Sequence, residues 1–273
     1  MSLRPIPDTH KHRRSDIGRR LRSTPKATAL TDGNYDVGCS GSWLSYKPRA
    51  IDVGDEHLQE LYEYMKLVPS TYNVRFKNKV RRIQCTLMKP SDVDYDFSGQ
   101  GNLTIHSNPA RRSQNASLPP ALVHKKWPHL VDLVLEDWIK YCAQLGCTRT
   151  IPNAVHANLY EDGDAWIDAH ADNEPSIDQT VPIGGYSFYM NQVGRKRPRS
   201  LQIYPVPEKV YRAKPNDHDG FNVELEHCSR YGMHGNFQST CTHELMKNQR
   251  SDTKRGTRVS LTVRAFLPRM PMT

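Results

Sequence analysis

Hydrophobic residues recur at helical spacing in two segments of the chain. Residues 57–67 place leucine and methionine side chains on one helical face, and Pro69 follows them. Residues 130–144 repeat this spacing with leucine, valine, tryptophan and tyrosine, and Gly146 provides the stop. The pattern therefore predicts two amphipathic helices, both before residue 150.

From residue 150 onward the pattern changes to short β-like runs separated by turn residues. These runs predict strands at 154–160, 186–191, 200–204 and 258–266. Helices that precede strands, without regular alternation of the two, argue against a doubly wound parallel sheet. We expect an α+β protein, mainly β, whose barrel or jelly-roll core is buttressed by N-terminal helices. The polar stretch 205–220 predicts a surface loop.

Residues 1–45 show neither the helical nor the strand-like spacing of hydrophobic residues, and they are rich in basic residues, Gly, Ser and Pro. They predict a basic, disordered arm that either neutralises phosphates or is a solvated tail. The net charge of the 273-residue chain is +9, which favours a polyanionic partner. Residues 46–273 predict a single folded domain, because all-β units often reach this size.

The chain lacks the sequence features of membrane and secreted proteins. No apolar run is long enough to cross a bilayer, and the N-terminal residues lack the apolar stretch of a secretory signal. Six cysteines without a CxxC pair indicate free thiols in a reducing compartment. We therefore expect an intracellular protein, nuclear if the host is eukaryotic and otherwise cytoplasmic.

Candidate chemistry begins with His170 and Asp172. Residues two apart on an extended strand point to the same side, so an imidazole and a carboxylate can meet one metal ion. An H-x-D pair alone is frequent, and a surface histidine bonded to a nearby acid is the ordinary alternative. His243 can supply a second imidazole. Two histidines and one carboxylate leave open positions on the ion, as suits non-haem Fe(II) that activates O2.

A structural zinc site is the competing interpretation of the same region. It would draw its ligands from His227, Cys228, His234, Cys241 and His243. These residues lack the paired spacings of common zinc modules, which favours iron.

Residues 258–264 read Arg-Val-Ser-Leu-Thr-Val-Arg and alternate polar with apolar side chains. Arg258 and Arg264 share the polar face. If that face meets solvent, the segment is an ordinary half-buried strand. If it lines a cavity, the two guanidinium groups can grip a dicarboxylate through charge-assisted hydrogen bonds.

In their order along the chain, these segments resemble the AlkB family of 2-oxoglutarate oxygenases, over residues 80–267. The resemblance rests on Asn158-Leu159-Tyr160, His170-Ala171-Asp172, Pro182-Ile183 to Ser187-Phe188, Met233-x-Gly235, Gln238, His243, Leu245, Lys247 and Arg258 to Arg264. Each segment alone is weak, and their combination is specific. The resemblance implies a double-stranded β-helix of jelly-roll or cupin type at about 150–267 and a substrate lid at about 80–105.

The resemblance also implies roles for the candidate residues. The iron ligands would be His170, Asp172 and His243. The far carboxylate of 2-oxoglutarate would pair with Arg258 and Tyr160, and its keto-acid end would lie near Asn158 and Arg264.

On the substrate side, the resemblance places Glu174 close to the substrate base. Tyr95 and Phe97 fall in the lid, where they could stack on a flipped base or equally be core aromatics. The chain departs from the family pattern in an insert at 193–220, whose arginines and lysine either contact phosphates or lie in a solvated loop.

The implied activity is Fe(II)- and 2-oxoglutarate-dependent demethylation of alkylated bases in DNA or RNA, with O2 as oxidant and formaldehyde, succinate and CO2 as products. One alternative is the same chemistry on a protein or a small molecule. Another is a catalytically silent nucleic-acid-binding module. We expect a monomer that binds nucleic acid and no membrane.

Overall fold

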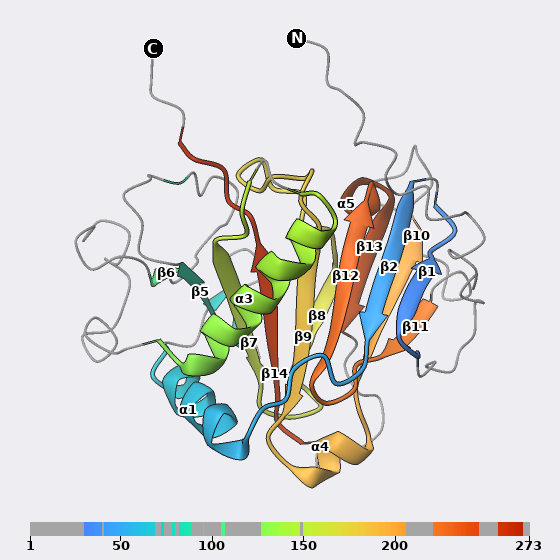
Figure 1. The fold of residues 1–273 in the computed structure, drawn as a ribbon. Helices are drawn as coiled ribbons and strands as arrows, with labels where there is room; N and C mark the ends of the chain where they lie inside the picture. Colours follow the sequence, from blue (N-terminus) through green and yellow to red (C-terminus); the bar gives the residue numbers. More distant parts are fainter. Residues whose placement is uncertain are drawn as a thin grey trace.

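Two β-sheets form the framework of the protein, whose structure is a computed structural model (Figure 1). The structure describes residues 30–39, 41–68, 72–73, 78–79, 82–88, 95, 105–106, 127–147, 150–205, 221–245 and 256–269. In the larger sheet the strand order is β1 (Gly33–Asp36), β2 (Ser42–Lys47), β12 (Ser229–Gly235), β9 (Ile183–Tyr189), β14 (Arg258–Arg264), β7 (Ala154–Tyr160), β5 (Ile83–Met88) and β6 (Ile105–His106). The smaller sheet has the order β11 (Phe221–Glu224), β10 (Ser200–Pro205), β13 (Cys241–Leu245) and β8 (Ile167–His170). A separate short pair joins β3 (Tyr72–Asn73) to β4 (Asn78–Lys79).

From β7 onward the chain winds between the two sheets. Strands β7, β9, β12 and β14 belong to the larger sheet, and the strands between them in sequence belong to the smaller one. Apart from the parallel pair β5 and β6, neighbouring strands are antiparallel. This winding is that of a double-stranded β-helix, so the predicted jelly-roll core is confirmed, as two facing sheets rather than a closed barrel.

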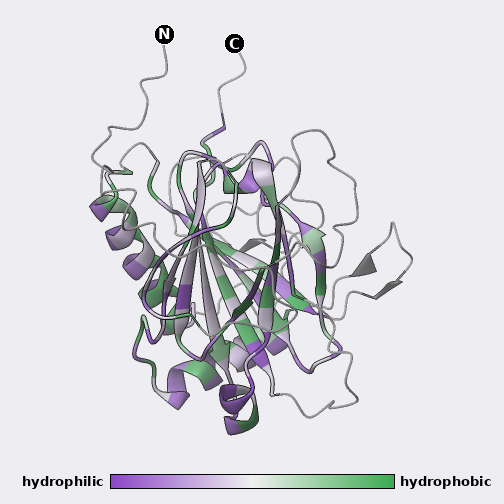
Figure 2. Ribbon diagram, turned by 90° about the vertical axis from the view of Figure 1, so that its right-hand side faces the viewer, coloured by the Kyte–Doolittle hydropathy of each residue, from purple (hydrophilic) through white to green (hydrophobic). Residues whose placement is uncertain are grey.

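Helices α1 (Asp55–Lys66) and α3 (His129–Gln144) cover the outer face of the larger sheet, and α3 lies across its centre (Figure 1). Seen from the side, the helices lie outside the strands and carry both hydrophobic and hydrophilic residues (Figure 2). Their buried side chains are Leu58, Leu61, Tyr64, Met65, Leu130, Val131, Val134, Leu135, Trp138 and Cys142. Both predicted amphipathic helices are therefore confirmed, with starts at residues 55 and 129. Two shorter helices are α4 (Gln192–Lys196) and α5 (Phe237–Thr240).

Close approach of α3 to the sheet depends on a glycine in β9. A Cβ atom at Gly184 would lie 2.4 Å from Cδ2 of Trp138, a distance that real contacts do not reach. Trp138 is fully buried, and its indole N–H donates to the carbonyl of Pro182 at 3.1 Å. The glycine thus leaves the space that the largest core side chain of α3 occupies.

Strand β14 is buried along its whole length. Val259, Leu261 and Val263 belong to the hydrophobic cluster that includes the inner faces of α1 and α3. The polar residues of the strand face the space between the two sheets, where they line a cavity. Of the two possibilities for this segment, the cavity-lining strand is therefore correct.

The predicted extent of the N-terminal arm is wrong in its last part. Strands β1 and β2 pair with each other, and β2 also pairs with β12. Tyr35, Val37 and Leu44 are buried in a hydrophobic cluster between the sheets. These strands have four and six residues, too few to show a clear period in a Gly- and Ser-rich context. Residues 1–29 lie outside the described residues.

Other boundaries differ by a few residues. Strand β9 covers Ile183–Tyr189 rather than 186–191, and β14 ends at Arg264 rather than residue 266. Strand β10 extends to Pro205, and most of the predicted loop at 205–220 lies outside the described residues. All six cysteines carry free thiols, as predicted. None of the described helices is long and apolar enough to span a membrane.

Candidate active site

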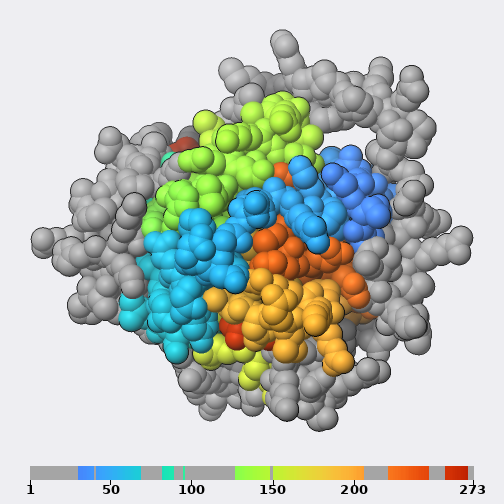
Figure 3. Space-filling view, turned by 60° about the horizontal axis from the view of Figure 1, so that its bottom comes forward, coloured from blue at the N-terminus to red at the C-terminus, as the bar shows by residue number. Residues whose placement is uncertain are grey.

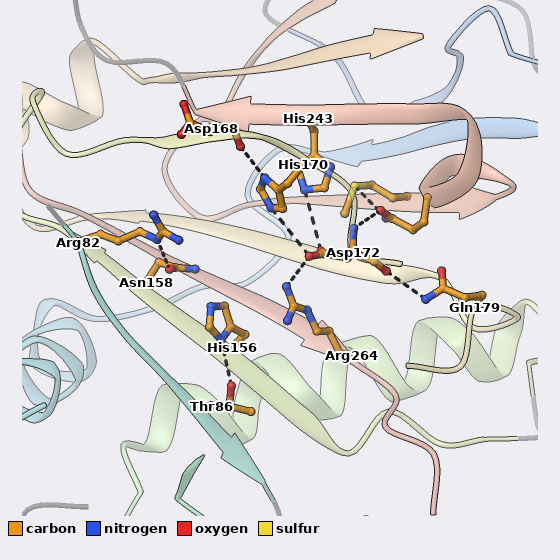
Figure 4. A network of polar contacts seen from close by, with 12 residues as sticks. Arg82, Thr86, His156, Asn158, Asp168, His170, Asp172, Gln179, His243 and Arg264 are labelled. Carbon is orange, nitrogen blue, oxygen red and sulfur yellow. Dashed lines mark hydrogen bonds and ion pairs between the residues drawn. The ribbon is translucent and has the colours of Figure 1, made fainter. Parts of the chain in front are cut away.

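The smaller sheet brings His170 and His243 together. They are directly opposite each other on β8 and β13, and their ring centroids are 4.4 Å apart (Figure 4). Asp172 follows β8 by two residues and points to the same place. One ligand atom from each of the three residues lies within 4.8 Å of the other two. Within the described residues, this is the one such group of His, Cys, Asp and Glu side chains.

Both imidazoles turn Nε2 toward the carboxylate. The distance to an Asp172 oxygen is 3.9 Å from Nε2 of His170 and 4.0 Å from Nε2 of His243. Nδ1 of His170 lies 2.7 Å from the carbonyl of Asp168 and must donate, because a carbonyl only accepts. That bond fixes the tautomer and leaves a lone pair on Nε2 for a metal ion.

Asp172 is 2% exposed and is held from three sides. Its backbone N–H donates to Oε1 of Gln238 at 2.8 Å, and its carbonyl accepts from Nε2 of Gln179 at 3.0 Å. Nη2 of Arg264 lies 2.5 Å from the carboxylate. Burial alone would raise the pKa of Asp172, but the charges of Arg264 and both histidines lower it to about 2. The carboxylate is therefore ionised and preoriented.

Burial lowers the pKa of His243 to about 3, and the nearby His170 acts in the same direction. Its imidazole is therefore neutral at physiological pH. A neutral imidazole and an ionised carboxylate are the protonation states that metal coordination requires.

Arg258 lies at the other end of β14, opposite Tyr160 of β7. Its guanidinium group is 2% exposed and lies 5.3 Å from the centroid of the Tyr160 ring. Its Nε donates to Oγ of Ser187 at 2.9 Å, and no acidic side chain in the described part of the chain contacts it. A buried cation without an acidic partner is costly, and it indicates a place for an anionic ligand.

Asn158 lies on the inner face of β7, opposite Ser260, and so between Arg258 and Arg264 along β14. It lines the same cavity. Its side-chain oxygen accepts from Nε of Arg82 at 3.1 Å, so Arg82 closes this side of the site (Figure 4). Arg82 also donates to the carbonyl of Trp166 at 3.3 Å, which ties β5 to the start of β8.

The predicted substrate residues are less closely grouped. Glu174 is half-buried beyond Asp172, and burial raises the pKa of its carboxyl. Tyr95 forms an isolated bridge with Pro268 and packs against the hydrophobic cluster between the sheets, so it is in part a core aromatic. Phe97 lies outside the described residues.

Some residues of the site were not singled out from the sequence. Gln179 and His156 carry no motif signal, and Gln238 was noted only as part of the segment that bears His243. Arg199, assigned above to a phosphate-binding or solvated insert, is 3% exposed. It lies 5.6 Å from the Tyr160 ring centroid and donates to the carbonyl of Ala165, so it supports the site from inside.

The competing zinc site does not form. His234 lies on the outer face of the larger sheet, where it stacks on Trp43 and its Nε2 bonds to Oγ of Ser45 at 2.8 Å. His227 accepts a hydrogen bond from the backbone N–H of Tyr189 through Nδ1. The candidate zinc ligands therefore lie on different parts of the fold.

A larger cavity, of about 670 Å³, lies between the loop that joins β2 to α1 and helix α4, on the face that Figure 3 brings forward. Side chains of both charges line it, including Arg49, Asp52, Arg195 and Glu226. Among the described residues it contains no group of three potential metal ligands. The chemistry is therefore placed in the smaller cavity, where the metal-binding candidates and Arg258 meet.

Known proteins that are similar to this chain include a solved structure and the members of one family. A solved structure described as "The structure of OsALKBH1" is similar over 81% of this chain and 97% of that chain, with 14% sequence identity and a TM-score of 0.46. No curated protein matches the chain significantly. The family model of the 2OG-Fe(II) oxygenase superfamily matches residues 72–264. The chain therefore belongs to the 2OG-Fe(II) oxygenase superfamily and is a dioxygenase that uses Fe(II), 2-oxoglutarate and O2.

Proposed function

We propose that this dioxygenase oxidatively demethylates alkylated bases in DNA or RNA. The observation that carries the proposal is the convergence of a His, Asp and His set with two buried arginines of one strand, in a sequence that resembles the AlkB family from Asn158 to Arg264. The net charge of +9 supports a polyanionic substrate.

In this proposal His170, Asp172 and His243 bind the iron. The residues fit that role because the Nε2 atoms of both histidines, His243 being neutral, and one ionised carboxylate converge without any other protein ligand in the described chain. Three ligands on one face leave positions for the co-substrate and O2. Gln238 and Gln179 hold the backbone of Asp172 and so preserve the geometry.

Arg258 is the anchor for the far carboxylate of 2-oxoglutarate. The buried guanidinium group has no acidic partner among the residues that the structure describes, and the dicarboxylate would supply one. Tyr160 lies beside it and can donate its hydroxyl hydrogen. Arg264 and Asn158 lie farther toward the metal-binding candidates, where the keto-acid end would bind.

When bound, the iron supplies O2 activation, which converts 2-oxoglutarate to succinate and CO2 and hydroxylates an N-methyl carbon of the base. The hydroxymethyl group then leaves as formaldehyde, and the strand is not cut. The protein orients the co-substrate, excludes water with apolar side chains such as Leu201 and Leu245, and presents an extruded base. We expect Glu174, two residues after Asp172, to contact that base.

The test is a panel of N-methylated single- and double-stranded DNA and RNA oligonucleotides, incubated with the Fe(II)-loaded protein, 2-oxoglutarate and O2. We expect formaldehyde and succinate in equal amounts and loss of the methyl group by mass spectrometry. Unmethylated oligonucleotides and the His170→Ala variant serve as controls. Absence of turnover on every oligonucleotide, with iron shown to be bound, would contradict the proposal.

Two further measurements separate the alternatives. If the substrate is a protein or a small molecule, unmodified DNA or RNA and added salt should not inhibit the reaction. If the protein is a silent binder, it should consume no 2-oxoglutarate, and His170→Ala should leave its affinity for nucleic acid unchanged.

A further inference from the structure

Two cysteines without a role in the proposed function are in contact near the active site. Cys39 lies in the turn between β1 and β2, at one edge of the larger sheet, and Cys241 begins β13 of the smaller sheet, two residues before His243. Their Sγ atoms are 3.7 Å apart, although the two residues are 202 positions apart in the sequence. The fold thus brings one thiol from the side of each sheet to the same place.

Hydrogen bonds orient both thiols. The thiol of Cys241 donates to the sulfur of Cys39, and the thiol of Cys39 donates to the backbone carbonyl of Thr240 at 3.5 Å. The hydroxyl oxygens of Ser42 and Thr240 are 2.8 Å apart, which ties the same turn to the residue before Cys241. The two sulfur atoms are therefore held in contact by their surroundings.

The backbone also brings the two segments close together. Gly235 has a φ of 64°, and a Cβ atom at this position would lie 1.9 Å from the carbonyl oxygen of Gly41. The same carbonyl accepts a hydrogen bond from the N–H of Asn236 at 3.0 Å. Because these contacts involve backbone atoms on both sides, the approach of the thiols is a property of the fold and not of two flexible side chains.

The two thiols differ in their access to solvent. Cys39 is half-buried, whereas Cys241 is 1% exposed. Cysteines that respond to oxidants are in general accessible and lie beside a second thiol that can complete a disulfide. Among the six free cysteines, no second pair of thiols is joined by a hydrogen bond in the described part of the chain. Accessibility and a neighbouring thiol therefore coincide at Cys39.

We propose that Cys39 and Cys241 form a redox modification site, at which hydrogen peroxide closes a reversible disulfide bond. The sulfur of Cys39 attacks the peroxide, the O–O bond breaks, and a sulfenic acid forms on Cys39 with release of water. The sulfur of Cys241 then attacks the sulfur of Cys39, the S–O bond breaks, and the oxygen leaves as a second water with the thiol proton. In sum, two thiols give two electrons and two protons to the peroxide and yield one disulfide and two water molecules.

The disulfide would link the two sheets beside the metal-binding residues. Cys241 follows α5, whose Gln238 holds the backbone of Asp172, and it shares β13 with His243. A disulfide bond is about 2.0 Å long, so sulfur atoms 3.7 Å apart need only a small shift to form it. The bond closes a long loop and therefore stabilises the fold, and it leaves the metal-binding residues in place.

The experiment treats the reduced protein, loaded with Mn(II) in place of iron, with a small excess of hydrogen peroxide. Free thiols are then blocked with N-ethylmaleimide, and a digest is analysed by mass spectrometry before and after reduction with dithiothreitol. We expect a linked pair of peptides that contain Cys39 and Cys241, present only before reduction. Four of the six thiols should remain free, that is, six minus the two that are linked. Six free thiols after treatment, or a linkage through other cysteines, would overturn the proposal.

Single variants distinguish the two chemical steps. In Cys241→Ser, Cys39 should stop at the sulfenic acid, which dimedone traps for detection by mass spectrometry. In Cys39→Ser, the buried Cys241 should stay unmodified under the same treatment. Cys147→Ser is the matched control, because it removes another half-buried thiol, and it should form the disulfide as wild type does. Equal reactivity of Cys241 with and without Cys39 would contradict the proposed order of steps.

Thermal stability gives a second readout. Oxidised wild type should melt about 5 °C or more above the reduced protein, and dithiothreitol should reverse the shift. Cys39→Ser should show no such shift, whereas Cys147→Ser should show it. The Kd of Mn(II) should change by less than about twofold on oxidation, because loss of the groups that orient metal ligands would cost about tenfold or more. If the disulfide forms but Tm does not rise, or if the Kd rises further than this, the bond distorts the fold and the proposed link between the sheets is wrong.

Discussion

At the scale of single residues, the position of Asp172 depends on side chains that bind no metal themselves. Gln238 accepts the backbone N–H of Asp172 and is buried, with its Nε2 directed at the sulfur of Met233. Replacement by methionine keeps the volume and removes the acceptor. We expect Gln238→Met to weaken Mn(II) or Fe(II) binding by about 10- to 100-fold, because the partners that orient metal ligands contribute on this scale.

Anaerobic metal titration measures that effect directly. Gln179→Met is the matched variant, since Gln179 bonds the carbonyl of Asp172 from a more exposed position. It should lose less affinity than Gln238→Met. Metal affinity of Gln238→Met within about twofold of wild type would show that Asp172 needs no such support.

His227 makes the stability of the protein depend on pH. Burial lowers its pKa to about 4, and Arg195 acts in the same direction while Asp55 opposes it. As pH falls from 6.5 toward 4, the unfolded chain takes up a proton that the folded protein does not, so stability is lost over that window. Protonation would also remove the acceptor that Nδ1 offers to the N–H of Tyr189.

We therefore expect His227→Gln to lose less stability than wild type between about pH 7 and pH 4.5, by about 1–2 kcal/mol. Urea unfolding at the two pH values measures the difference. The pKa values of the buried His156 and His243 are also lowered, and their contribution is the same in both proteins and cancels. Equal losses in wild type and variant would refute the prediction.

At the scale of elements, the contact between α3 and the larger sheet is set by Gly184 and Trp138. An added methyl group at Gly184 meets the indole ring, so Gly184→Ala should destabilise the protein by about 1–3 kcal/mol through overpacking. Trp138→Leu removes the clashing ring. In the double variant the alanine should therefore cost much less than in wild type, which a double-mutant cycle of urea unfolding measures. Additive losses would show that the two side chains do not meet.

The same glycine explains where sequence reasoning fell short. The residue patterns of 154–160 and 258–264 predict strands β7 and β14, and for β14 the alternation of polar and apolar residues also predicts its two faces. The β-like pattern predicts strand β9 only from residue 186, because Gly184 and Gly185 have little strand propensity, whereas the family resemblance includes Pro182-Ile183 to Ser187-Phe188 as a core strand. Those glycines are required by the rings of Trp138 and Tyr231, which come from elsewhere in the chain. Such a tertiary reason leaves no local pattern.

The candidate metal ligands, in contrast, are recognisable from the sequence, although their arrangement is not. The residue types and their order were informative for His170, Asp172 and His243, whereas the register that places the two histidines opposite each other is a property of the folded sheet. Arg199 was misplaced because a basic insert and a buried guanidinium group look alike in sequence. Burial and hydrogen-bond partners, which distinguish them, appear only in the structure.

At the scale of the whole molecule, the winding of the chain assembles one site from both sheets. The smaller sheet contributes the two histidines and apolar walls, and the larger sheet contributes the arginines and the polar row of β7. Ligands that join these groups should therefore stabilise the entire fold, since they bind only when the two sheets face each other.

Because of this linkage, replacing Arg258 should affect the stability of the free protein and of the ligand-bound protein differently. Without ligand, no acidic side chain of the described residues pairs with the buried guanidinium group, so Arg258→Met should leave stability unchanged or raise it. With Mn(II) present, 2-oxoglutarate at about 100 times its Kd should stabilise wild type by about 2.7 kcal/mol, or about 5–10 °C in Tm. Arg258→Met should lose this increment and keep that of the metal, whereas His243→Ala should lose both. Differential scanning fluorimetry with each ligand tests these expectations, and a full 2-oxoglutarate increment in Arg258→Met would show that the co-substrate is anchored elsewhere.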